Sequence, residues 1–169
     1  MDMIKIYRAK GIEENDKDTW YVGGYVMMSD TTYCFKEDYE RAAREGNDPR
    51  HHYIIFDKMV DWGLPNRHLQ AEIRPDTLCM STEYVKNNKL VFQGDIINLN
   101  PDEIVGIVRF GKYRSPFDSP MTEHYGFYIE WPENFHLRKD IGYWMNCEET
   151  NVIGNIIDNP DLLKRGKEE

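Results

Sequence analysis

A short stretch of aromatic and basic residues has the composition of a binding surface. Aromatic side chains stack on unpaired bases while Lys and Arg side chains contact phosphates, so this mixture can bind single-stranded nucleic acid. The same residue types can line the groove of a peptide-binding domain. A third interpretation leaves half of the side chains in the core and half on a solvated face. The candidate binding residues are Arg109, Phe110, Lys112, Tyr113, Arg114 and Phe117.

A second pattern, Asp76 followed by Glu83 and Lys86, invites comparison with metal-dependent nucleases. Such an enzyme holds carboxylates and a lysine around one metal ion and one water molecule. Glu83 and Lys86 are separated by two residues, and on a strand this spacing points them to opposite faces. The pattern therefore favours surface charge beside a turn. We predict no catalytic residues and no enzyme activity.

Potential metal ligands are scattered along the chain. His51 and His52 are adjacent, and neighbours on a strand rarely share an ion because they face opposite sides. The other three histidines are isolated. Cys34, Cys79 and Cys147 are far apart and odd in number, which is typical of a reducing compartment and not of a disulfide framework. We expect no metal, no cofactor and a cytoplasmic location.

The net charge of the chain disfavours anionic binding partners. The chain has 169 residues, and its 30 Asp and Glu against 21 Lys and Arg give a formal net charge of -9. Binding to duplex nucleic acid depends on cations that neutralise phosphates, so this balance makes a duplex an unfavourable partner. An anionic membrane surface is disfavoured for the same reason. No window has the apolar length of a membrane span, and the start lacks the apolar core of a signal peptide.

The elements that must position these residues are mainly β-strands, because 13% of the residues are aromatic. We predict an α+β region over residues 1–88, with first strands at "MIKIYRA" and "TWYVGGYVMM" and one short helix in "KEDYERAAREGND". Acidic residues begin that helix and Gly46 ends it. The stretch "GLPNRH" is expected to be a turn or loop, and Asn87-Asn88 is expected to be a turn.

Residues 89–169 are expected to form a second domain. Its short strands lie at roughly even spacing, which is typical of a small β-barrel. Breaks are predicted at Gly94-Asp95 and at Pro101-Asp102, a strand at "IGYWMN", and a helical turn beginning at Asn159-Pro160. The predicted core residues are Ile96, Val105, Ile107, Val108, Ile129, Ile153 and Ile156.

Three stretches together resemble the YopX-like protein family. They are "MIKIYRAKG", "LVFQGDIINLN" and "VIGNIIDNPDLL". "TWYVGGYV" and "EIRPDTLCMSTEYV" resemble further family segments, although "CMSTEYV" stands where members often have Gln-Tyr-Thr-Gly-Leu. The residues that carry the motifs are Gly94, Asp95, Gly154, Asn155, Asn159 and Pro160.

The resemblance implies a protein encoded by a bacteriophage or prophage, with a C-terminal part similar to an SH3-type β-barrel. It implies that the last strand closes this barrel and that Leu162 and Leu163 cover one end. It brings no activity with it. A small barrel has few interior positions, so the aromatic content also predicts exposed contact surfaces and a homo-oligomer.

Two functions remain open at this point. The sequence favours a non-enzymatic protein-interaction or self-assembly module that binds a phage or host protein in the cytoplasm of a bacterial host. The alternative is an accessory protein that binds single-stranded nucleic acid weakly through residues 109–117.

Overall fold

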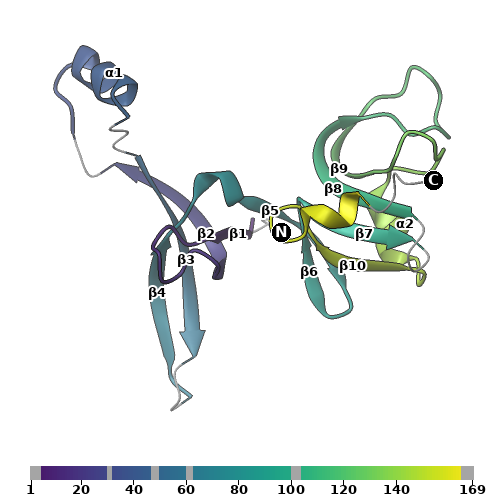
Figure 1. The fold of residues 1–169 in the computed structure, drawn as a ribbon, viewed down its shortest axis with the longest axis horizontal. Coiled ribbons are helices and arrows are strands. Elements are labelled where there is room, and N and C mark those ends of the chain that lie inside the picture. The colour runs from purple at the N-terminus through teal and green to yellow at the C-terminus, as the bar shows by residue number, and fades with distance from the viewer. Residues whose placement is uncertain (1–4, 30–31, 47–49, 60–62, 100–103, 165–169) are drawn as a thin grey trace. The chain divides into compact units, whose positions relative to one another are not determined.

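The computed structural model describes residues 5–29, 32–46, 50–59, 63–99 and 104–164. These residues fold mainly into antiparallel β-strands, as predicted. The chain divides into two compact units, Met1–Leu78 and Cys79–Glu169. The division comes before the expected boundary at residues 88 and 89, because β5 (Cys79–Lys86) forms a hairpin with β6 (Lys89–Phe92). Figure 1 shows the strands and helices of each unit.

The first unit is built on antiparallel strands that pair in the order β4-β3-β2-β1. Its buried core is small, consisting of Ala9, Ile54 and Ile73, with tyrosines and Phe56 packed against it. The expected loop at "GLPNRH" is confirmed for Gly63 and Leu64 but was wrong for the next four residues, because pairing with β3 holds them in strand β4. The strands are β1 (Tyr7–Lys10), β2 (Trp20–Ser29), β3 (Arg50–Met59) and β4 (Pro65–Glu72).

The predicted helix of the first unit is confirmed as α1 (Lys36–Arg44). Acidic side chains lie in its first turn and basic ones in its last, where they complement the helix dipole. Gly46 follows with φ = +79°, the left-handed conformation that favours glycine after a helix. No residue of α1 is buried. A 3-10 turn, η1 (Pro75–Thr77), precedes β5.

The second unit contains an antiparallel sheet with strand order β10-β7-β8-β9. Every residue of β7 is buried, since β7 has a paired strand on each side. Among the described residues the sheet is open, with β9 and β10 at its edges, so β10 covers an edge and does not close a barrel. The strands are β7 (Asp95–Leu99), β8 (Ile104–Tyr113), β9 (His124–Glu130) and β10 (Thr150–Asn155).

The segment "IGYWMN" is a helix, α2 (Ile141–Asn146), where we predicted a strand. Ile141, Trp144 and Met145 are buried and belong to the core of the second unit. Their spacing of three and four residues puts them on one helical face. Aromatic and β-branched residues suggested a strand, but packing of this face decides the structure.

The expected core is confirmed in part. Among the predicted residues Ile96, Val108 and Ile129 are fully buried, whereas Val105, Ile107 and Ile156 are partly buried. Ile153 is 39% exposed, so its assignment to the core was wrong. The register of β10 against β7 shifts between Val152 and Gly154, and Val152 packs on the core instead.

Two motif segments far apart in the sequence meet between β7 and β10. Asn155 lies opposite Asp95 in the strand register. The backbone N–H of Ile156 donates to the Gly94 carbonyl at 2.9 Å. Gly94 has φ = +84°, which disfavours any other residue there. The buried Asp95 carboxylate accepts from the Phe92 backbone N–H at 2.8 Å and so fixes the tight bend.

Asn155 and Asn159 organise the turn after β10. The Asn155 side-chain oxygen accepts from the backbone N–H groups of Ile157 and Asp158 at 3.0 and 2.9 Å. A Cβ atom on Gly154 would lie 2.5 Å from Oδ1 of Asn159, so only glycine fits. The turn leads into the 3-10 helix η2 (Pro160–Leu163), which contacts β8. The expected break at Pro101-Asp102 lies outside the described residues.

Candidate functional site

The predicted binding residues follow β8 and the loop after it. The two-residue period of a strand puts Arg109 and Tyr113 on one face and Phe110 and Lys112 on the other. Phe110 packs against Tyr125 and Phe127 of β9, with ring centroids 5.2 and 4.8 Å away. The structure therefore does not gather all six predicted residues into one site.

The three cations of this stretch lie beside carboxylates. Arg109 Nε donates to Glu130 Oε2 at 2.8 Å, and Lys112 Nζ donates to Glu123 Oε1 at 2.8 Å. Arg114 lies 4.0 Å from the other oxygen of Glu123. The hydrogen bond from Lys112 lowers the pKa of Glu123 and raises the pKa of Lys112. Each cation thus has a negative neighbour that would compete with a phosphate.

This pairing predicts weak binding of nucleic acid. In near-physiological salt, fluorescence anisotropy is expected to show no tight binding of a duplex. Glu123→Gln frees Lys112 and Arg114, so affinity for a single strand should rise. The slope of log affinity against log salt concentration should become steeper by about 0.7 for each additional phosphate that is neutralised. Glu133→Gln removes the same charge away from these cations and serves as the control. Nanomolar binding of a duplex by the unmodified chain would contradict the prediction.

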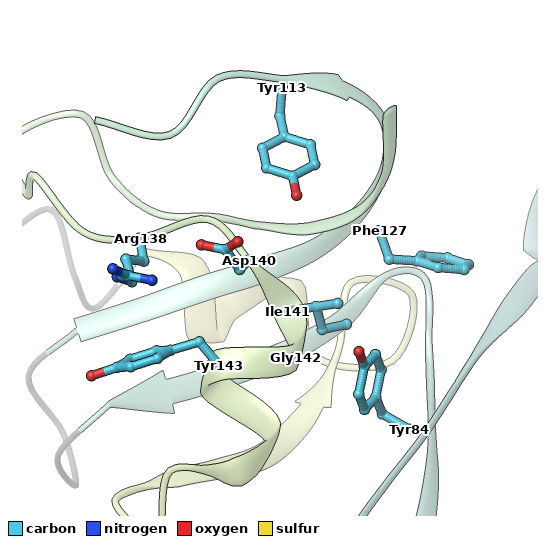
Figure 2. Close-up of a pocket in the computed structure, with 8 residues that line it drawn as sticks. All are labelled: Tyr84, Tyr113, Phe127, Arg138, Asp140, Ile141, Gly142 and Tyr143. Atoms are coloured by element: carbon cyan, nitrogen blue, oxygen red, sulfur yellow. The ribbon is translucent and has the colours of Figure 1, made fainter. Parts of the chain in front are cut away.

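A pocket of about 480 Å³ lies in the second unit. Pockets of this size accommodate small ligands or single side chains of a partner. Its lining comes from β5, β8, β9 and the beginning of α2, as Figure 2 shows. The lining residues are Tyr84, Tyr113, Phe127, Arg138, Asp140, Ile141, Gly142 and Tyr143.

Two tryptophans fix the wall of the pocket that precedes α2. The indole N–H groups of Trp131 and Trp144 both donate to the backbone carbonyl of Arg138, each at 2.8 Å. The two indole rings meet edge to face with centroids 5.1 Å apart. The Ile129 backbone N–H donates to the Lys139 carbonyl at 2.9 Å. Because buried groups hold this segment, the positions of Arg138 and Asp140 are set by the core.

The aromatic rings of the pocket differ in their surroundings. Tyr113 is partly buried and stacks on His124 and on Tyr128, with centroids 5.1 and 5.0 Å away. Tyr84 and Tyr143 are 39% and 52% exposed, so an incoming group can reach them. A Cβ atom on residue 142 would lie 2.8 Å from the Tyr84 hydroxyl, and glycine there leaves room for the Tyr84 side chain.

Arg138 connects the pocket with the predicted surface. Its guanidinium carbon lies 5.3 Å from the centroid of the Tyr143 ring and 5.7 Å from that of Phe117. Both distances are within the range of cation–π attraction. Of the six predicted residues, Tyr113 therefore lines the pocket and Phe117 borders it. Arg109, Phe110, Lys112 and Arg114 lie outside its lining.

The electrostatic environment of Tyr113 is negative. Burial raises the pKa of its hydroxyl, and the charges of Asp140 and Asp118 raise that pKa further. The Asp140 carboxylate does not cap α2, and no side chain in the described part of the chain bonds to it. Figure 2 shows the Tyr113 hydroxyl pointing to the side of the pocket where Asp140 lies.

Of the nuclease-like pattern Asp76, Glu83 and Lys86, the lysine has a structural role. Lys86 Nζ donates to the backbone carbonyls of Met145 and Cys147 at 3.3 and 2.6 Å. These carbonyls lie at the end of α2, where a cation complements the helix dipole. Asp76 lies 3.5 Å from Arg74 and forms an exposed ion pair with it.

The adjacent histidines have separate partners. His51 Nδ1 lies 2.6 Å from a Glu72 oxygen, and His52 Nδ1 lies 2.7 Å from the Tyr25 hydroxyl. Within the described ranges there is no group of three or more His, Cys, Asp or Glu side chains that could hold a metal ion. The described residues also include no helix with the length and apolar character needed to cross a bilayer.

Comparisons with protein-family models, with curated proteins and with solved structures gave no match to the chain.

Proposed function

We propose that the chain is a non-enzymatic protein-interaction module and that the pocket of the second unit receives a segment of the partner. The observation that carries this proposal is the pocket itself, which presents the accessible rings of Tyr84 and Tyr143 beside a wall held by two buried tryptophans. Tyr, Trp and Arg dominate the binding energy of protein interfaces. Rings on a rigid frame also lose little conformational entropy on binding.

Binding of single-stranded nucleic acid is the second candidate. Exposed rings at Phe110, Phe117 and Tyr125 favour it, since unpaired bases stack on such rings. The carboxylates beside Arg109, Lys112 and Arg114 weaken it, because phosphates must compete with them. The interaction module is therefore the better supported function.

Self-association is part of the proposal and is supported by the first unit. Its strands expose Val22, Met27, Met28 and Met59 although its buried core is small. These exposed apolar side chains are available for contact with a second copy of the chain. Light scattering across micromolar concentrations is expected to give a mass above that of one chain. The mass of a single chain throughout that range would contradict a homo-oligomer.

The proposal includes membership of the YopX-like family, with an origin in a bacteriophage or prophage and a site of action in the host cytoplasm. The contact between Gly94-Asp95 and Gly154-Asn155 supports it, because the motif residues then form one structural unit. Kinship with SH3-type folds is supported by the short antiparallel strands of the second unit. Because this sheet is open in the described residues, the similarity that we propose covers the antiparallel strands and not a closed barrel.

Selection of random displayed peptides on the immobilised full chain tests the proposed function. We expect enriched peptides that bind Tyr143→Ala at least about tenfold more weakly, as for a typical hot-spot tyrosine. The matched control is Tyr125→Ala, which removes a tyrosine that is 72% exposed and lies outside the pocket. Absence of enrichment, or loss of binding only in Tyr125→Ala, would overturn the proposal.

A further inference from the structure

We infer that the pocket of the second unit binds a cationic side chain, lysine or arginine, presented by the partner segment. This inference rests on the proposed function and names the chemistry that the same pocket recognises. It is carried by the combination of Asp140 with the rings of Tyr84, Tyr113 and Tyr143 in one lining.

The first observation is the carboxylate of Asp140. It lines the pocket and is partly buried, and within the described residues no side chain bonds to it. A partly buried carboxylate attracts a cation more strongly than an exposed one, because the surrounding dielectric constant is lower. An incoming ammonium or guanidinium group would supply the partner that this carboxylate lacks.

The second observation is the set of ring faces around the carboxylate. Tyrosine rings carry negative potential on their faces and attract cations placed within about 6 Å of the centroid. Tyr84, Tyr113 and Tyr143 line the pocket together with Phe127. Several aromatic faces beside one carboxylate form the kind of cage that selects a cation over a neutral side chain of equal length.

The chain itself shows that a ring of this pocket accepts a guanidinium group. Arg138 lies over Tyr143 at 5.3 Å and over Phe117 at 5.7 Å. Arg138 approaches from the segment before α2, and no cation lies over the ring of Tyr84 in the described residues. A partner cation can therefore lie over the exposed ring of Tyr84 in the way that Arg138 lies over Tyr143.

An anionic side chain is the competing ligand, because Arg138 lines the same pocket. Its guanidinium group already stacks on two rings, and a nearby anion would also face the charge of Asp140. Besides burial, the negative charges of Asp140 and Asp118 raise the pKa of Tyr113, so this side of the pocket lies near carboxylates. The net charge of -9 adds long-range repulsion of anions. The cation is the ligand that these observations favour.

Four capped tripeptides with a central Arg, Lys, norleucine or Glu test the inference. Each is titrated into the full chain labelled with nitrogen-15, and the backbone signals of Gly142 and Tyr143 report binding. We expect the Arg and Lys peptides to bind at least about tenfold more tightly than the norleucine peptide. Asp140→Asn should reduce that affinity by about tenfold, whereas Glu133→Gln, which removes an equal charge outside the pocket, should leave it unchanged within about twofold.

Salt provides a second readout that does not depend on how well a variant folds. Binding of the Arg peptide to the unmodified chain should weaken as sodium chloride is raised, and binding of the norleucine peptide should not. Equal affinities for the Arg and norleucine peptides, or an unchanged affinity in Asp140→Asn, would overturn the cation assignment while leaving the proposed function standing. Tightest binding of the Glu peptide would assign the pocket to anions through Arg138. If neither these peptides nor any displayed peptide shifts the pocket signals, the proposed function fails as well.

Discussion

Trp144→Ala is expected to destabilise the second unit by about 3–5 kcal/mol, the usual cost of removing a buried tryptophan. Trp144 is buried in the core, meets Trp131 edge to face and donates to the Arg138 carbonyl. The substitution removes all three interactions and opens a cavity beneath the pocket wall. Since small domains are stable by only about 5–15 kcal/mol, this loss is a large share of the total.

Urea titration followed by NMR measures the free energy of unfolding of the second unit separately from that of the first. The methyl signals of Ile129 belong to the core of the second unit and report its unfolding. Tyr143→Ala, the adjacent helical position, should cost about 1–2 kcal/mol, because it removes an exposed ring with an edge-to-face contact to Trp144 and a cation–π contact to Arg138. Equal unfolding midpoints for Trp144→Ala and Tyr143→Ala would contradict the assignment of Trp144 to the core.

Deletion of residues Val152–Leu163 is expected to abolish cooperative unfolding of the second unit. The deletion removes most of β10 and exposes the edge of β7, a strand that is buried along its whole length. It also removes the hydrogen bond from Ile156 to the Gly94 carbonyl. An uncovered strand edge beside an exposed core favours aggregation over folding.

Thermal unfolding monitored through the same Ile129 signals tests the deletion. Asp161→Ala is the control within the deleted segment, because among the described residues Asp161 pairs with Lys164 in an exposed ion pair of small energetic value. The control should keep a sharp transition near the unmodified midpoint. A sharp transition in the deletion variant would show that the second unit folds without β10 and would refute this account of the terminal motif.

The turns and motifs could be predicted from the sequence because they depend on local backbone chemistry. Asn87 and Asn88 both have positive φ in the β5–β6 turn, a conformation that asparagine tolerates well. Gly94 and Gly46 occupy left-handed positions for the same kind of reason. The side chains of Asp95 and Asn155 bond to backbone groups within three residues along the chain, so their roles are local as well.

The errors arose where tertiary packing decides. Six residues of α2 are too few to show a helical period clearly, and their β-forming residue types pointed to a strand. β4 has little alternation of apolar residues, and its strand conformation comes from pairing with β3. Ile153 is an apolar residue in a strand and was therefore predicted to be buried, but the register shift in β10 turns its side chain outward.

The pocket was beyond prediction for a related reason. Tyr84, Tyr113 and Tyr143 come from three segments separated by roughly thirty residues each, and only the folded second unit brings them together. Arg138 and Asp140 lie in a segment with no regular strand pattern. The abundance of tyrosine was the one available signal, and it could not locate the pocket.

The most direct test of the account is a measurement of intermolecular nuclear Overhauser effects between the Arg-containing tripeptide and the full chain. The side-chain CH₂ protons nearest the guanidinium group are expected to show contacts with the ring protons of Tyr84 and Tyr143, because these are the accessible rings of the pocket. Contacts confined to Phe110 and Tyr125, which lie outside the pocket, would contradict the account.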